Sequence, residues 1–164
     1  MNNLFIGSSI IERWNNLPFP NSINLGISGL TTNLLQKKYS LVLSKYPNTQ
    51  SIFLYIGSND IVYKHNIQHT FQNIIEFILY LNRQNNNIHI FFIAILKSPN
   101  RTKIQKTQID YLNRKMREFI SPNFHFINCN RQLNSNENYL SNDQTHLSSI
   151  GYNKLNQCLS SSTY

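Results

Sequence analysis

The stretch that decides the fold lies near the start of the chain, at Leu4–Trp14, with the sequence LFIGSSIIERW. Its first part, Leu4–Ile6, has the continuous apolar character of a parallel strand that is buried on both faces. Gly7 allows a tight turn, and Ser8 or Ser9 can cap the amphipathic helix that follows. Open α/β sheets bind their ligands at the carboxyl ends of the strands, so the turn places a serine hydroxyl at such an end. Gly-Ser-Ser is also an ordinary turn composition, and a purely capping role is the alternative interpretation.

The same alternation of buried strand and helix continues along the chain. The further strands are predicted at Ser22–Leu25, Ser51–Ile56, Ile88–Ala94 and Phe124–Ile127. Helices are predicted from Thr31 or Thr32 to just before Pro47, over Thr70–Asn85, over Lys103–Ile120, and from Ser148 or Ser149 onward. Parallel strands need long right-handed crossovers, which helices of this kind provide. The pattern therefore predicts a three-layer α/β/α sandwich with a five-stranded parallel sheet in the flavodoxin-like order 2-1-3-4-5, built as one domain over residues 1–164.

Composition narrows the classes of partner. The net charge is +8, from 15 Lys and Arg against 7 Asp and Glu, which permits an anionic partner. Many of the basic residues fall within Lys97–Arg117, but neither interleaved aromatic residues nor a nucleic-acid motif accompanies them. We interpret this stretch as a solvated loop and helix face, with a phosphate-binding face as the alternative, and expect no nucleic-acid partner. No apolar run approaches the roughly 20 residues of a membrane span.

Two cysteines and two closely spaced histidines invite a metal or disulfide interpretation. Cys129 and Cys158 fit no metal spacing, and without a recognisable leader we expect free thiols and a cytoplasmic protein, with a mature secreted form as the alternative. His65 and His69 lie four residues apart, but no third ligand accompanies them. We therefore expect neither a metal nor another cofactor.

A carboxylate and an imidazole come together just before the last predicted helix. Asp143-Gln144-Thr145-His146 follows the final strand, so it lies at the same sheet edge as the turns after the first three strands. A carboxylate that binds one ring nitrogen fixes the tautomer and leaves the other nitrogen free to act as a base. This arrangement indicates a general base, although the same residues could simply form a helix-capping loop.

Four segments together resemble one enzyme family. Gly7–Ile10, Asn24–Gly29, Gly57–Asp60 and Asp143–His146 resemble, in the right order, the sequence blocks of the GDSL or SGNH hydrolases. The resemblance spans almost the whole chain. Each block alone is a weak indication of the family, whereas four blocks in order, each after a predicted strand, are a strong one.

The resemblance implies a role for each block. Ser9 would be the nucleophile, His146 the general base and then acid, and Asp143 the group that orients it. The backbone N–H groups of Ser9 and Gly29 and the side-chain amide of Asn59 would form the oxyanion hole.

The chain departs from the family in two respects. Ser8 stands where the family has an aspartate. Separately from these departures, Gly26 is the alternative to Gly29 as the backbone donor, and Gly29 is preferred because its surroundings match the second block better. The chain is also short, which predicts an open, shallow pocket suited to a small acyl group. We therefore expect a serine esterase that removes acetyl from a small-molecule or carbohydrate ester. A lipase or thioesterase, an acyltransferase and an inactive binding module are the alternatives, and the sequence makes no prediction about oligomeric state.

Overall fold

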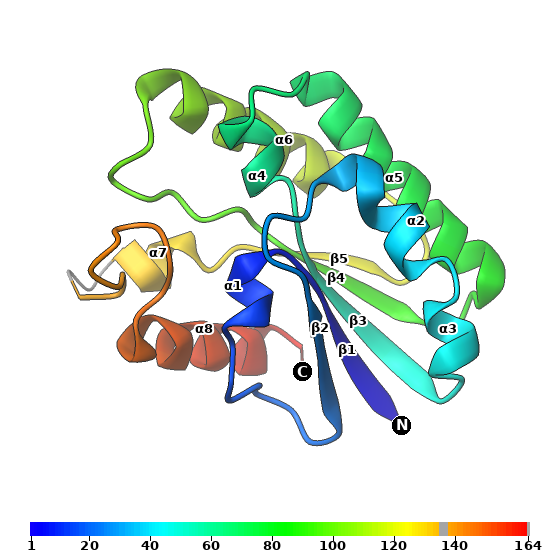
Figure 1. Cartoon of the computed structure of the whole chain (residues 1–164). Helices are drawn as coiled ribbons and strands as arrows, with labels where there is room; N and C mark the ends of the chain where they lie inside the picture. Colours follow the sequence, from blue (N-terminus) through cyan, green and yellow to red (C-terminus); the bar gives the residue numbers. More distant parts are fainter. Residues whose placement is uncertain (135–137, 164) are drawn as a thin grey trace.

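A single parallel sheet forms the centre of the molecule. The computed structural model describes residues 1–134 and 138–163. Its strands are β1 (Asn2–Gly7), β2 (Ser22–Gly26), β3 (Thr49–Tyr55), β4 (His89–Ile93) and β5 (Phe124–Ile127). All pair in parallel in the order β2-β1-β3-β4-β5 (Figure 1). The five predicted strands and their order are confirmed.

Helices cover both faces of the sheet. They are α1 (Ser9–Glu12), the 3₁₀ helix η1 (Thr32–Leu34), α2 (Leu35–Tyr39), α3 (Val42–Lys45), α4 (Ser58–Val62), α5 (Ile67–Gln84), α6 (Lys103–Glu118), α7 (Asn130–Asn134) and α8 (Ser149–Ser162). In Figure 1, α2, α5 and α6 lie on one side of the sheet, and α1, α7 and α8 lie on the other. The chain therefore folds as the predicted three-layer α/β/α sandwich.

Alternation along the strands divides the interior into two apolar cores. In β1, Leu4 and Ile6 enter the core beneath α5 and α6, whereas Phe5 enters the core beneath α1 and α8. Phe5 stacks on Phe53 of β3 with ring centroids 4.6 Å apart, and Phe53 stacks on Phe91 of β4 at 4.8 Å. Side chains of successive strands thus meet in register across the sheet, which keeps the carboxyl ends of β1, β3 and β4 at one edge.

The helices differ from their predicted extents in ways that local polar groups explain. The helix predicted to begin at Thr70 begins at Ile67, because the side chain of Asn66 accepts the N–H groups of Gln68 and His69 and caps it there. The helix predicted from Thr31 or Thr32 to just before Pro47 is divided into η1, α2 and α3. Leu41, at the junction of α2 and α3, is 73% exposed although its spacing matches the apolar face.

Two short helices lie where turns or loops were predicted. α4 begins directly after Gly57, and α7 lies between β5 and the Asp143–His146 segment, where we predict a polar loop over 128–141; residues 135–137 of that loop are outside the described residues. Among the predicted caps, Ser148 does accept the N–H of Gly151 at the start of α8. Ser8 occupies the capping position of α1 but makes no capping hydrogen bond, so the interpretation of the first serines as simple helix caps is wrong.

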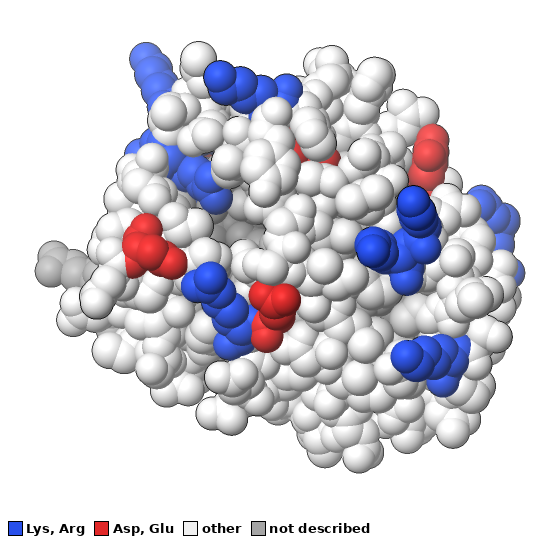
Figure 2. Space-filling model, viewed as in Figure 1, with Lys and Arg blue, Asp and Glu red and all other residues white. Residues whose placement is uncertain are grey.

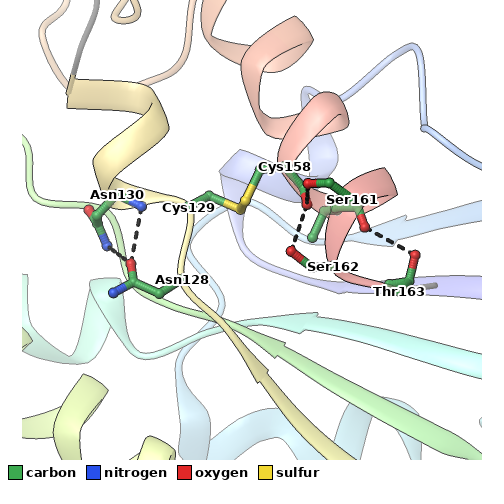
Figure 3. The surroundings of a disulfide bond; sticks show 8 residues. Asn128, Cys129, Asn130, Cys158, Ser161, Ser162 and Thr163 are labelled. Atoms are coloured by element: carbon green, nitrogen blue, oxygen red, sulfur yellow. Dashed lines mark hydrogen bonds between the residues drawn. A yellow bond between two sulfur atoms is a disulfide. The ribbon is translucent and has the colours of Figure 1, made fainter.

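Cys129 and Cys158 form a disulfide, so the expectation of free thiols is wrong. Cys129 lies two residues after the end of β5 and Cys158 lies in α8, and both are buried in the same apolar core (Figure 3). The cysteines are 29 positions apart in sequence, and only the packing of α8 beside the end of β5 brings them together. The closed loop contains both Asp143 and His146.

No helix in the described ranges is long and apolar enough to cross a membrane.

We predict that breaking this disulfide lowers the free energy of unfolding by about 3 kcal/mol, because the cross-link restricts the unfolded chain. Urea denaturation of the wild type with and without a reductant measures this, since reduction keeps both side chains in place. The Cys129→Ala/Cys158→Ala double variant is the control and should not respond to reductant. An identical midpoint for oxidised and reduced wild type would contradict the prediction.

Candidate active site

Three side chains from opposite ends of the chain form a hydrogen-bonded line. The Nε2 atom of His146 lies 2.9 Å from the Oγ atom of Ser9, across 137 positions of sequence. The other ring nitrogen, Nδ1, lies 2.6 Å from Oδ2 of Asp143. With Nδ1–H donating to the carboxylate, Nε2 is left as an acceptor for the serine hydroxyl proton. The structure thus brings Ser9, His146 and Asp143 together in the order a nucleophile, a base and an orienting acid require.

The end of β1 presents Ser9 at the sheet edge. A Cβ atom at Gly7 would lie 2.1 Å from the carbonyl oxygen of Tyr55 in β3, so only glycine permits this close approach of the two strands. Ser8 follows and donates its N–H to that same carbonyl at 3.2 Å. Ser9 then begins α1, where its own N–H has no carbonyl one turn earlier to bind. This N–H therefore remains available to a ligand beside the hydroxyl.

Asp143 is held ionised by a ring of donors. It accepts the backbone N–H groups of His146 and Thr145, each at 2.9 Å, and the hydroxyl of Ser141 at 2.8 Å. The guanidinium of Arg13 lies 3.6 Å from its Oδ2 atom. The hydrogen bonds from the backbone and ring of His146, followed by those from Thr145 and Ser141, hold the pKa of Asp143 well below its usual range. The carboxylate is consequently negative at neutral pH.

Gly29 and Asn59 lie beside Ser9 on the same cavity. Gly29 has a φ angle of 73°, a left-handed conformation that favours glycine, and its N–H meets no acceptor among the residues with described positions. Asn59 donates one amide hydrogen to the carbonyl of Leu30 at 2.9 Å, which leaves its second amide hydrogen free. Gly26, the competing glycine, donates its N–H to the side chain of Asn24 instead and does not line the cavity. The geometry therefore favours Gly29 over Gly26.

The cavity has a volume of about 530 Å³ and a mixed polar and apolar lining. Figure 2 shows this face of the molecule, with a hollow near the centre of the view. The lining residues are Ser8, Ser9, Ile10, Ser28, Gly29, Tyr55, Ser58, Asn59, Val62, Tyr63, Leu96, Ser98, Arg101, Leu140, Thr145 and His146. They come from the ends of the first four strands and from the loop before α8, as the topology of an open α/β sheet requires.

The remaining polar residues of the third sequence block hold the loop together. Asp60 is 1% exposed and accepts both the N–H and the hydroxyl of Thr32, and His65 lies 3.3 Å from its carboxylate. Asp60 therefore holds this loop in place by hydrogen bonds. His69 does not complete a metal site with them, since no three His, Cys, Asp or Glu side chains gather suitably within the described part of the chain.

The sequence reasoning missed the contribution of the loop after β4. Ser98 and Arg101 both line the cavity, and the hydroxyl of Ser98 donates to the carbonyl of Gln144, next to the Asp143–His146 segment. Arg101 was grouped with a solvated basic face. The rule that placed the other blocks, polar residues directly after a buried parallel strand, applies to this loop as well and could have identified it.

The geometry agrees with a known family. The sequence profile of the GDSL-like lipase/acylhydrolase family matches residues 5–154. The chain belongs to this family. The resemblance seen in the sequence is therefore confirmed, and the protein is a carboxylic ester hydrolase that acts on acyl esters.

Solved structures share the fold over nearly the whole chain. A protein from Streptococcus pneumonia is 26% identical with a TM-score of 0.83, covering 99% of this chain and 84% of that one. A GDSL-like lipase from Bacteroides thetaiotaomicron is 24% identical with a TM-score of 0.77, covering 98% and 86%. An acetyl xylan esterase from Geobacillus stearothermophilus is 17% identical with a TM-score of 0.72, covering 96% and 92%. A comparison with curated proteins gave no match.

We predict that Asp143 contributes to stability in a pH-dependent way. Because its pKa is lower in the folded than in the unfolded chain, this contribution is fully present above the ordinary carboxyl pKa of 3.8 and is lost as the pH falls through the lowered value. The difference in free energy of unfolding between wild type and Asp143→Asn should therefore be larger at about pH 7 than at about pH 3. A difference that is constant over this range, measured by urea denaturation, would contradict the assignment.

Proposed function

We propose that this acylhydrolase is a serine esterase that forms an acyl-enzyme at Ser9. The observation that carries the proposal is the line of hydrogen bonds from Ser9 through His146 to Asp143, with distances of 2.9 and 2.6 Å. A serine hydroxyl is a weak nucleophile at neutral pH unless a base stands ready to take its proton. A binding module has no need of such a base.

The proposed reaction follows from these positions. As the oxygen of Ser9 attacks the ester carbonyl carbon, His146 takes the hydroxyl proton, and Asp143 stabilises the resulting imidazolium. The negative carbonyl oxygen receives hydrogen bonds from the N–H groups of Ser9 and Gly29 and from the free amide hydrogen of Asn59. Collapse of this intermediate breaks the bond to the alcohol, which leaves with the proton from His146. A water molecule then repeats the sequence on the acyl-enzyme and releases the acid.

A small acyl group, with acetyl as the preferred candidate, suits the site best. The cavity is open to solvent at the sheet edge, and the hydroxyls of Ser28, Ser58 and Ser98 share its wall with a comparable apolar part. This mixed wall can take up a small acyl group and offers hydrogen-bonding partners to a hydroxyl-rich alcohol, whereas a cavity open to solvent does not enclose a long lipid tail. We therefore propose an acetylated carbohydrate as the substrate, a class supported by the acetyl xylan esterase of the same fold.

The disulfide bears on where the enzyme works. Reducing compartments keep most thiols free, whereas disulfides persist in secreted and periplasmic proteins. The bond between Cys129 and Cys158 therefore supports the secreted alternative over the cytoplasm. An acetylated carbohydrate outside the cell is a substrate consistent with that location.

We predict that p-nitrophenyl acetate is hydrolysed faster than p-nitrophenyl esters with long acyl chains, because a cavity of about 530 Å³ that is open to solvent does not enclose a long tail. Ser9→Ala should lower turnover by at least about 1000-fold, since the nucleophile is absent. Circular dichroism of the variant checks that the fold is kept. Turnover by Ser9→Ala close to that of the wild type would contradict the mechanism, and a preference for long chains would contradict the substrate class.

We predict that Asn59→Ala lowers kcat by about 100- to 1000-fold, because a transition-state hydrogen bond is lost. KM for p-nitrophenyl acetate should change little, since the donor serves the charged oxygen that develops during attack. The variant also loses the hydrogen bond from Asn59 to the carbonyl of Leu30, so thermal unfolding measures any loss of stability separately. A rise in KM at constant kcat would instead assign Asn59 to substrate binding.

A further inference from the structure

Arg101 is a cationic side chain in the wall of the cavity. It lies in the loop between β4 and α6 and lines the same cavity as Ser9 and His146. Its Nη2 atom donates to the hydroxyl oxygen of Ser58 at 3.0 Å. Its Nε atom is buried without a hydrogen-bond partner among the described groups. The guanidinium therefore reaches the site with most of its donors unused, since arginine has five.

The charge of Arg101 has no neutralising partner within the described residues. Other basic side chains nearby are engaged: Lys97 pairs with Asp110, Arg13 approaches Asp143, and Lys106 donates to a backbone carbonyl. The described lining of the cavity contains no Asp or Glu, so Arg101 is its one permanently charged residue. In Figure 2, basic side chains gather beside the hollow, over the loop between β4 and α6.

A partly buried guanidinium that lacks a partner favours an oxyanion ligand. Carboxylates and phosphates match the planar fork of arginine with two parallel hydrogen bonds, which lysine does not reproduce. Burial of a donor that has lost water without gaining a partner costs free energy, and a bound anion would remove that cost. The hydroxyl of Ser58, which accepts from Arg101 and shares the cavity wall with it, would lie beside such a group.

We propose that Arg101 binds a carboxylate or phosphate carried by the alcohol part of the ester. The proposal rests on the proposed function: if the acyl group is as small as acetyl, it carries no charge, and the anion must belong to the part that leaves. Arg101 thus determines specificity by selecting acetyl esters of acidic carbohydrates over neutral ones. The substrate class becomes an acetylated sugar that bears a carboxylate or a phosphate.

A merely positioning role for Arg101 makes a different prediction. Its hydrogen bond to Ser58 supports the loop that also carries Asn59, so removal of the side chain could lower turnover of every ester alike. If Arg101 instead binds the anion, removal of its side chain would impair only the hydrolysis of anionic esters, chiefly by raising KM. A comparison of charged and neutral esters therefore separates the two roles.

The test compares wild type, Arg101→Gln, Arg101→Lys and the control Lys103→Gln, which removes an exposed charge two positions away and outside the cavity. The substrates are acetylated galacturonic acid, acetylated glucose 6-phosphate and acetylated glucose. Arg101→Gln should lower kcat/KM about 10- to 100-fold on whichever anionic ester the wild type prefers, and less than about threefold on the neutral ester. Arg101→Lys should recover only part of the loss, and Lys103→Gln should match the wild type. The identity of the preferred ester distinguishes carboxylate from phosphate.

Equal losses on charged and neutral esters would overturn the proposal and leave Arg101 a positioning residue. Absence of any anionic preference in the wild type would overturn it as well, while Ser9-dependent hydrolysis of p-nitrophenyl acetate would still support the proposed function. If the wild type hydrolyses none of these esters, isothermal titration calorimetry measures the binding of galacturonate and of glucose 6-phosphate to the Ser9→Ala protein. Binding that Arg101→Gln abolishes supports the anion site, and absence of binding overturns it.

Discussion

The site depends on one hydrogen bond, between Ser9 and His146, that joins the first turn of the chain to its last loop. Such a bond needs both ends of the chain held in place, and α8 provides this. The hydroxyl of Tyr152 donates to the backbone of α1 at 2.8 Å, and the indole of Trp14 donates to Asn156 at 3.0 Å. Helix α8, which follows the loop that carries His146, is therefore anchored to α1. The disulfide joins α8 to the segment just after β5.

Around this bond the sheet separates packing from chemistry. The carboxyl-terminal parts of β1, β3 and β4 carry apolar residues into two cores, and the polar residues of the site come after these strands have ended. Because β1 approaches β3 closely at Gly7, Ser9 lies at the carboxyl-terminal edge of the sheet. The turns that follow the neighbouring strands lie at the same edge. Among the described residues, the result is a cavity of mixed lining in which an imidazole, backbone N–H groups and one guanidinium face a common space. The proposed ester chemistry and the proposed anion recognition therefore share one edge of the sheet.

The sequence predicted the strands well because their signal is local: a short apolar run that stops at glycine or serine. It also placed Ser9, Gly29, Asn59, Asp143 and His146 at one edge, since parallel topology determines which loops meet. Features that depend on the packing of distant segments were missed or wrong. The disulfide is the clearest example, because only the position of α8 against β5 makes the pairing possible. The helix ends shifted for a similar reason, since side-chain caps such as the one before α5 are weak signals beside apolar periodicity.

The central claim is that His146 and Asp143 make the hydroxyl of Ser9 unusually reactive. The most direct measurement is mass spectrometry of the protein after treatment with a serine-directed phosphonate ester, followed by peptide mapping. One adduct per chain is expected on Ser9, formed rapidly in the wild type and far more slowly in His146→Ala. An adduct on a different residue, or equally rapid labelling of Ser9 without His146, would contradict it.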